Sequence, residues 1–208
     1  MVIRETNLAF TRPLVPRKKT VRIVLHHTGG GDVSAHTVHE WHLQRKGFGG
    51  IGYHYLIRSD GGIERGRPEQ MRGVHASAAN ADSIAIALTG NFETRLPTTQ
   101  QMASLVRLVR DIRDRYQAMA MSVEDRRAVN NLHADIARVS ARAADPTART
   151  WFEQQHGGID EYLAVQRTRL TAVLARTPVL AVVGHSDVAR TACPGRLFPW
   201  AELRRRLV

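Results

Sequence analysis

His185 and Cys193 stand eight residues apart, and a Pro-Gly pair follows the thiol directly. Cys193 is the only cysteine of the 208 residues, which excludes an internal disulfide. An imidazole together with a thiolate favours zinc, whose protein ligands are mostly histidine, cysteine and carboxylate. A zinc site would need at least a third ligand, so the fold must bring a distant residue to this segment. The alternative is a buried, inert cysteine that packs as a small hydrophobic residue.

The third ligand has two candidates, His26 and His27. His26 ends the apolar, β-branched run at residues 21–26, which predicts a buried strand, and His27 follows it before a glycine-rich loop at 28–31. Ligands commonly bind at the ends of strands in α/β sheets. Because neighbouring residues of a strand face opposite sides, only one of the two histidines should point at a metal.

Further apolar and periodic segments predict an α/β fold with a central mixed β-sheet, helices on its faces and the metal at the sheet's edge. Residues 53–58 and 62–65 predict a β-hairpin, and 83–88 and 178–183 predict strands. Thr98 and Gln101 form a capping-box signature that opens a helix. Other helices are expected at about 34–43, 122–144 and 160–175.

The chain is expected to form a single domain over residues 1–208. Residues 1–20 form an irregular basic lead-in, and residues 118–172 form an inserted helical pair before the last strand, with Pro146 as a helix breaker. The bland expectation for the insertion is a lid or buttress that packs on the domain.

The net charge of +11 predicts attraction to a polyanion, such as nucleic acid, an anionic membrane or an anionic wall polymer. No DNA- or RNA-reading motif accompanies the charge, so specific nucleic-acid binding is not expected. No apolar run reaches the length of a membrane span, and the first residues lack a secretory signal. We therefore expect synthesis in the cytoplasm without export.

Five segments, in order, resemble the type 2 N-acetylmuramoyl-L-alanine amidases, the zinc-dependent family of phage lysozymes and peptidoglycan-recognition proteins. They are Val-Leu-His-His-Thr at 24–28, Gly-Ile-Gly-Tyr-His-Tyr-Leu-Ile at 50–57, Asp-Gly-Gly-Ile-Glu-Arg-Gly-Arg at 60–67, Val-His-Ala at 74–76 with Asn80 and Ser83-Ile84, and the Gly-His-Ser-Asp-Val and Cys-Pro-Gly pieces of 184–195. The resemblance covers about residues 20–100 and 178–200.

The resemblance implies that Zn²⁺ is held by His26, His185 and Cys193, with His27 on the opposite side of its strand. It implies that Tyr53 is an active-site residue. Thr191, where phage members carry lysine, would stabilise an oxyanion with its hydroxyl.

The resemblance also implies that His75 and Asn80 bind substrate in a groove. Their alternative is a scaffolding role in the loop. Some relatives use a glutamate base in the strand at 83–88, but this chain has Ala87 there, which leaves Asp187 and Glu64 as untested carboxylates. Asp187 is expected to cap a turn or support the site indirectly.

The implied reaction is hydrolysis of the amide between N-acetylmuramic acid and L-alanine in peptidoglycan. The implied role is a phage or prophage endolysin that acts on the cell wall after release, with an anionic envelope surface as a further partner. The alternative to a lid or buttress is that the insertion contacts the cell envelope or shapes the groove for a particular stem peptide. Two alternatives are a catalytically silent peptidoglycan-binding protein and a cytoplasmic amidase that recycles wall fragments.

Overall fold

The computed structural model describes residues 1–45 and 47–208, which divide into two compact units. The first unit comprises residues 1–113 and 180–208, and the second comprises residues 114–179. The second unit encloses the range 118–172 that the sequence analysis expects as an insertion. That the whole chain forms a single domain stays a prediction.

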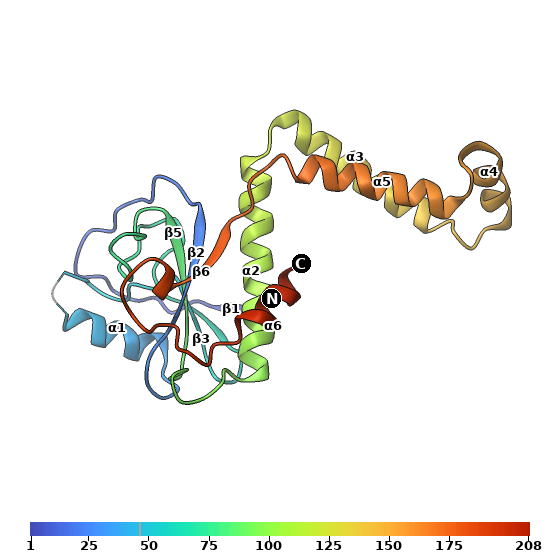
Figure 1. Ribbon diagram of the computed structural model, residues 1–208. Helices are drawn as coiled ribbons and strands as arrows, with labels where there is room; N and C mark the ends of the chain where they lie inside the picture. Colours follow the sequence, from blue (N-terminus) through green and yellow to red (C-terminus); the bar gives the residue numbers. More distant parts are fainter. Residues whose placement is uncertain (46) are drawn as a thin grey trace. The chain divides into compact units, whose positions relative to one another are not determined.

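The first unit holds the sheet and three α-helices (Figure 1). Its elements are β1 (Ile3–Arg4), β2 (Arg22–His27), α1 (Ala35–Leu43), β3 (Tyr55–Ile57), β4 (Ile63–Arg65), β5 (Ser83–Leu88), the first part of α2 (Thr99–Ala120), β6 (Ala181–Gly184), the 3₁₀ turn η1 (His185–Asp187) and α6 (Trp200–Leu207).

The six strands form one sheet in the order β1-β4-β3-β5-β2-β6. β3 and β4 are antiparallel, as expected for the predicted hairpin, and all other neighbours are parallel. This mixed sheet with helices on its faces confirms the predicted α/β fold class. β2 lies between β5 and β6, so the ends of three parallel strands meet where the sequence places its candidate ligands.

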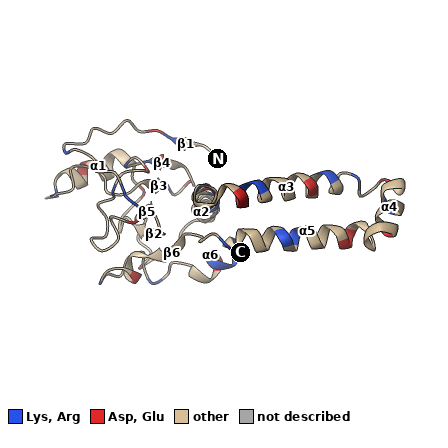
Figure 2. Cartoon of the chain, turned by 90° about the horizontal axis from the view of Figure 1, so that it is seen from above, with Lys and Arg blue, Asp and Glu red and all other residues tan. Residues whose placement is uncertain are grey.

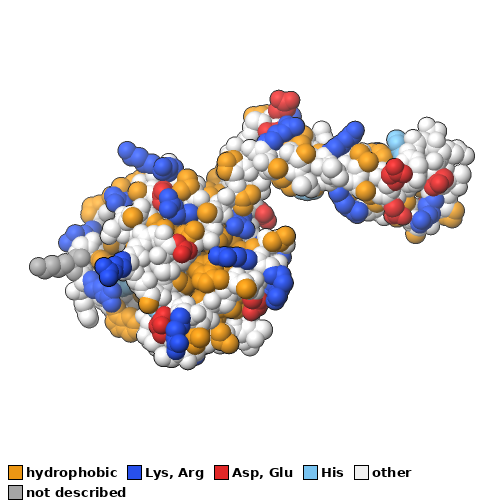
Figure 3. All heavy atoms as spheres, in the orientation of Figure 1, with side chains coloured by type: hydrophobic (Ala, Val, Ile, Leu, Met, Phe, Trp, Pro, Cys, Tyr) orange, Lys and Arg blue, Asp and Glu red, His pale blue; other side chains and the backbone are white. Residues whose placement is uncertain are grey.

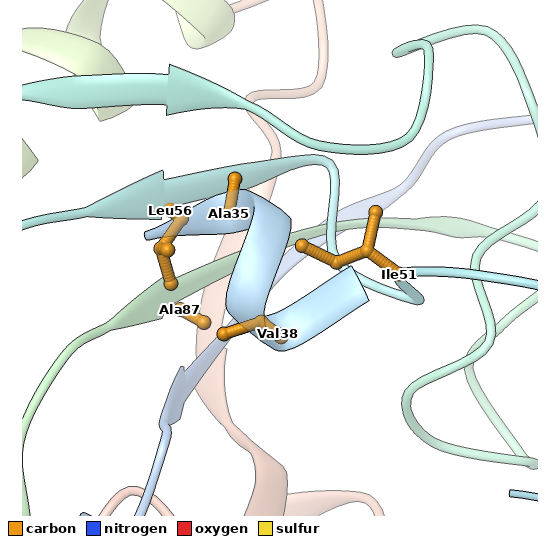
Figure 4. Packing of buried hydrophobic residues seen from close by; sticks show 5 residues of the cluster. All are labelled: Ala35, Val38, Ile51, Leu56 and Ala87. Atoms are coloured by element: carbon orange, nitrogen blue, oxygen red, sulfur yellow. The ribbon is translucent and has the colours of Figure 1, made fainter. Parts of the chain in front are cut away.

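Helices α1 and α2 lie on opposite sides of the sheet (Figure 1). Ala35 and Val38 of α1 pack against Ile51, Leu56 and Ala87, and all five side chains are buried (Figure 4). The apolar side chains of α2 are buried as well: Leu105, Leu108, Val109 and Ile112. Strand residues alternate between the two faces, and His26 stands two residues after Val24, so both share a face of β2.

The N-termini of α1 and α2 are capped by the residues that precede these helices in the sequence. Ser34 caps α1 by accepting a hydrogen bond from the Thr37 N–H. At the start of α2, the Gln101 N–H donates to Thr98 Oγ1 and the Thr98 N–H donates to Gln101 Oε1, both at 3.0 Å. The predicted capping box is therefore confirmed.

The second unit contains the end of α2 and three further helices, α3 (Val123–Ser140), α4 (Pro146–His156) and α5 (Ile159–Leu174). α3 and α5 lie side by side in both ribbon views (Figures 1 and 2). Val139, Phe152, Ile159 and Leu163 form one buried cluster, and Met121, Val129 and Val173 form another. This unit therefore has hydrophobic clusters of its own.

The predicted helix breaker Pro146 was interpreted wrongly, because it is the first residue of α4. Proline is tolerated in the first turn of a helix, where its missing N–H has no helical partner to lose. Asp145 completes this start by accepting the N–H groups of Thr147 and Ala148. The insertion thus holds a third helix, beyond the expected pair.

Charged side chains are distributed along the chain. Figure 2 shows both basic and acidic residues on α3 and on α5, and basic side chains are interspersed with hydrophobic ones on the face in Figure 3. Within the described residues, no helix combines the length and the apolar character that crossing a membrane requires.

Candidate metal centre

Three side chains that are distant in sequence meet at the ends of β2 and β6. His26, His185 and Cys193 offer donor atoms that all lie within 4.8 Å of one another. In the part of the chain that the structure describes, they form the one cluster of at least three such residues. The sequence analysis selects the same three residues, and their role as ligands stays a prediction.

The sheet register brings the two histidines together. β2 and β6 are parallel, with Leu25 opposite Gly184, so the next residue of each chain segment is a histidine. The ring centroids of His26 and His185 lie 4.6 Å apart. Parallel pairing of β2 and β6 therefore makes one half of the site.

Cys193 reaches the site on the loop that follows η1. The Ser186 N–H donates to the Cys193 carbonyl at 2.8 Å, which closes this loop. The thiol sulfur lies 3.7 Å from His26 Nδ1 and accepts the backbone N–H of His27 at 3.3 Å. An N–H donor aimed at sulfur favours the thiolate form that a metal ligand requires.

The His27 ring lies outside this cluster. Its Nδ1 accepts the Phe92 N–H at 3.0 Å, and its ring packs 5.8 Å from the Phe92 ring. His26, by contrast, is 1% exposed. Strand alternation therefore separates the two adjacent histidines as expected, and His26 is the one beside Cys193.

The donor set fits zinc. Tetrahedral zinc has Zn–N distances of about 2.0 to 2.1 Å and a Zn–S distance of about 2.3 Å, which places nitrogen and sulfur roughly 3.6 Å apart. The observed separation of 3.7 Å between His26 Nδ1 and Cys193 Sγ matches that edge. Three protein ligands, with two of them partly exposed, also suit a catalytic site that keeps a fourth position open.

Burial shifts the acid–base properties of these residues. It lowers the pKa of His26 well below the usual value, and the neighbouring His75 and His185 lower it further. Burial also lowers the pKa of His185 and raises the pKa of the Cys193 thiol to about 11, against a smaller opposing effect of the His27 N–H. The imidazoles are thus held neutral, which is the form that binds metals.

Tyr53 lies beside the cluster, with its ring centroid 4.9 Å from that of His26. Burial raises the pKa of its phenol, so the hydroxyl remains a hydrogen-bond donor at neutral pH. Gly52 sets its position, because a Cβ there would lie 1.8 Å from the Val74 carbonyl oxygen. Only glycine lets these two backbone segments approach so closely, which explains the Gly-Tyr pair of the sequence.

Thr191 lies on the same loop as Cys193 and is exposed. Its Oγ1 accepts the Cys193 N–H at 3.3 Å, which leaves the hydroxyl hydrogen free of that bond. A threonine hydroxyl both accepts and donates. It can therefore support the loop and present a donor at once.

The structure gives the two untested carboxylates other partners. Glu64 is buried and accepts the Ala35 N–H at 2.6 Å at the start of α1. Asp187 accepts the Gly184 N–H at 2.8 Å and caps the turn after β6. Ala87 stands opposite His26 in the β2–β5 register, so this position of β5 offers no carboxylate beside that histidine.

His75 and Asn80 lie behind the cluster. Nδ1 of His75 is 2.9 Å from His26 Nε2, and its Nε2 is 3.2 Å from Ser83 Oγ. Asn80 Oδ1 accepts the N–H groups of His75 and Ala76. Their binding of substrate stays a prediction, and the loop scaffolding considered as its alternative describes Asn80's contacts.

Sequence reasoning missed Ser83 as a partner of the site. It stands in the Asn-x-x-Ser-Ile segment and is the first residue of β5. Only the fold shows that its hydroxyl lies against His75.

Comparisons with known proteins agree with the fold and the motifs. The family model described as "N-acetylmuramoyl-L-alanine amidase" matches residues 16–148. A solved structure of the amidase LysC from Clostridium intestinale URNW is similar over 100% of this chain and 97% of that chain, with a TM-score of 0.65 and 28% sequence identity.

Two curated relatives match shorter segments. The endolysin of Enterobacteria phage K11 is 31% identical over 100 residues, which are 45% of this chain and 66% of that protein. Peptidoglycan-recognition protein SC2 of Drosophila melanogaster is 31% identical over 105 residues, 47% of this chain and 57% of that protein. The matched segments thus span about half to two thirds of these relatives. Because the family model matches more than half of the chain, this protein belongs to the type 2 N-acetylmuramoyl-L-alanine amidase and peptidoglycan-recognition-protein family.

Proposed function

We propose that this protein is a zinc-dependent N-acetylmuramoyl-L-alanine amidase that cleaves the amide between the lactyl group of N-acetylmuramic acid and L-alanine of the stem peptide. One observation carries the proposal. His26, His185 and Cys193 meet beside the protonated phenol of Tyr53 in a chain of the amidase family.

The reaction is a hydrolysis. A water oxygen bonds to the lactyl carbonyl carbon, the bond from that carbon to the alanine nitrogen breaks, and the departing amine takes a proton that originates from the water. Zinc held by His26, His185 and Cys193 would polarise the carbonyl and lower the pKa of a water. The neutral imidazoles described above can serve as its ligands without first losing a proton.

Tyr53 and Thr191 supply the hydrogen-bond donors in this proposal. The tetrahedral intermediate of amide hydrolysis places negative charge on the former carbonyl oxygen, and donors fixed in advance stabilise that charge. Tyr53 offers a phenol that burial keeps protonated, and Thr191 offers a hydroxyl two residues from Cys193. Neither brings positive charge, so the metal has to carry most of the charge stabilisation.

The rival function is recognition of peptidoglycan without cleavage, because the relatives include peptidoglycan-recognition proteins. The presence of all three candidate ligands favours the enzyme, since a protein that only binds its target needs no zinc ligands.

Purified sacculi incubated with the protein distinguish the two functions. Mass analysis of the products should show released stem peptides with a free L-alanine amine and glycans with a free lactyl carboxylate. A chelator should abolish both products, and added zinc should restore them. Binding to sacculi without release of peptide would contradict the amidase and support the recognition protein.

The proposed biological role is that of a phage or prophage endolysin that acts on the wall after release. Two observations support it: the resemblance to endolysins of phage K11 and C. intestinale, and a net charge that attracts the protein to anionic envelopes. A recycling amidase would instead prefer soluble muropeptides. Comparing rates on intact sacculi and on soluble muropeptides therefore tests this role.

A further inference from the structure

We propose that His75 is a positioning residue that fixes the tautomer of His26, so that the Nδ1 lone pair of His26 remains available to a metal ion. The inference rests on the metal site proposed above. It assigns His75 a role in the metal centre, whereas the sequence resemblance implies contact with substrate.

The proposal rests on a series of side-chain contacts behind His26. Nε2 of His26 lies 2.9 Å from Nδ1 of His75, and Nε2 of His75 lies 3.2 Å from Ser83 Oγ. Ser83 Oγ in turn lies 2.5 Å from the Ala79 carbonyl oxygen. On the other side of His26, Nδ1 lies 3.7 Å from Cys193 Sγ.

The contact between Ser83 Oγ and the Ala79 carbonyl sets the direction of this series of hydrogen bonds. A carbonyl oxygen only accepts, so the single hydroxyl hydrogen of Ser83 donates to Ala79. Ser83 Oγ must then accept at its contact with His75, which places the His75 hydrogen on Nε2. A neutral imidazole carries one N–H, so Nδ1 of His75 accepts from Nε2–H of His26.

The consequence falls on the nitrogen beside the thiol. With its only hydrogen on Nε2, His26 presents a bare Nδ1 toward Cys193. A hydrogen bond from the second ring nitrogen of a metal-bound histidine fixes its tautomer and orientation, and losing such a partner typically costs about 10- to 100-fold in metal affinity. Here a second histidine takes the place of the usual carboxylate or carbonyl.

The backbone around His75 holds its ring in place. Asn80 Oδ1 accepts the His75 N–H at 2.8 Å and the Ala76 N–H at 2.9 Å. Gly73 makes room, because a Cβ there would lie 2.5 Å from the His75 ring. The two rings meet nearly at right angles, at 84°. These contacts hold the His75 ring where both of its nitrogens lie within hydrogen-bond distance of partners inside the protein.

The direct test is NMR of the zinc-free protein with ¹⁵N-labelled histidine, because the protonated and bare nitrogens of a neutral imidazole have distinct ¹⁵N shifts. His26→Asn and His75→Asn variants assign the signals. The proposal predicts a hydrogen on Nε2 of both His26 and His75. A hydrogen on Nδ1 of His26 would overturn it, and if one of these variants fails to fold, through-bond correlations within each labelled ring of the wild-type protein still distinguish Nδ1 from Nε2.

Variants of His75 add a second readout, the zinc affinity measured by competition with a chromophoric chelator. His75→Leu removes the acceptor and should lower the affinity about 10- to 100-fold. His75→Asn, whose Oδ1 stands where Nδ1 does, should restore most of it and keep the His26 tautomer. His36→Leu, at an exposed histidine of α1, is the control and should leave the affinity unchanged.

A role of His75 in substrate binding alone gives a different result. His75→Leu would then raise KM while the tautomer and the zinc affinity stay as in the wild type, and that outcome would overturn the proposal. Neither the tautomer nor the zinc affinity requires peptidoglycan. Failure to release stem peptide, with both of these as predicted, would therefore count against the proposed function alone.

Discussion

The sulfur of Cys193 lies 3.7 Å from Nδ1 of His26, although 167 positions separate the two residues in the chain. The pairing register of β2 and β6, together with the loop after η1, accounts for this contact. Parallel pairing of β2 with β6 places His26 next to His185, and the loop closed by Ser186 returns Cys193 to the same point. The fold thus holds a His-His-Cys cluster whose spacing suits zinc.

Replacing Cys193 by serine should remove zinc and activity together. A serine hydroxyl does not ionise near neutral pH and is a poor zinc ligand, so we expect zinc content to fall well below one per protein and release of stem peptide to be lost. Elemental analysis and the sacculus assay measure the two quantities. His36→Gln serves as the control. Full activity in a zinc-free Cys193→Ser protein would refute the mechanism.

Replacing Tyr53 by phenylalanine should slow catalysis while zinc stays bound. Loss of one donor to an oxyanion typically costs about 10²- to 10³-fold in kcat. The ring that packs 4.9 Å from His26 is retained, so zinc content should equal that of the wild type. The measurements are kcat on a muramyl peptide and zinc per protein. An unchanged kcat would exclude Tyr53 from the reaction.

Thr191→Val is the companion variant and should reduce kcat less than Tyr53→Phe does. Valine also removes the acceptor of the Cys193 N–H, so zinc affinity has to be measured alongside. A loss of kcat at full zinc occupancy would assign the hydroxyl to the oxyanion. A loss of zinc with normal kcat in the loaded protein would assign it to the loop.

Asp32 should stabilise the fold near the strand ends. Its carboxylate accepts from Arg58 Nε and Nη2 at 3.0 and 2.9 Å, and also from the Ser59 N–H and Thr89 Oγ1. The Arg58 guanidinium is the main cause that holds the pKa of Asp32 far below its usual value. Asp32→Asn should lower the free energy of unfolding at pH 7 by about 1 to 2 kcal/mol, because the pair is partly exposed.

The effect has a defined pH dependence. A carboxylate whose pKa is depressed by folding contributes stability above its unfolded pKa of about 3.9, and that contribution is lost as the pH falls further. Urea unfolding at pH 7, 5 and 3 should therefore show equal differences between wild type and Asp32→Asn at pH 7 and 5 and a smaller one at pH 3. Asp60→Asn, which keeps the Oδ1 acceptor for the Gly62 N–H, is the control. A difference that stays constant down to pH 3 would contradict the ion pair.

The second unit should be removable without loss of the metal centre, because its buried clusters are its own. The amide of Gln117 donates to the Leu174 carbonyl at 2.9 Å, so the chain enters and leaves this unit at adjacent points. A short Gly-Ser linker in place of residues 119–172 should leave zinc affinity as in the wild type. Loss of zinc affinity in a folded variant would contradict this.

The same deletion tests the expected contact with the cell envelope. If the insertion contacts the envelope, binding and activity on intact sacculi should fall while activity on soluble muropeptides persists. Unchanged activity on intact sacculi would refute that contact. A loss on both substrates would favour the alternative of a lid or buttress.

The strands and the three clustered residues could be predicted because each left a local signal. The run at 83–88 coincides with β5, and the histidine at the end of β2 was chosen over its neighbour by family resemblance and strand alternation. The predicted strand at 178–183 begins three residues early, at Pro178 rather than Ala181. Proline lacks an N–H and is disfavoured inside a sheet, which agrees with the later start.

Other features depend on contacts that no local pattern records. The contact of Ser83 with His75 arises from a turn at Ala79 and from strand placement, so the sequence shows it only as a motif. Helix α4 was missed because Pro146 marks a helix start as well as a helix end. Helix α6 was missed although Trp200, Leu203 and Leu207 stand at helical spacing, because its eight residues are too few for that pattern to stand out.

X-ray absorption at the zinc edge of the purified, active protein tests most directly that His26, His185 and Cys193 form the metal centre. The account predicts a first shell with one sulfur at about 2.3 Å and nitrogen or oxygen neighbours at about 2.0 to 2.1 Å, two of them with the outer-shell signals of imidazole. The sulfur shell should disappear in Cys193→Ser. A first shell without sulfur in fully active wild-type protein would contradict the account.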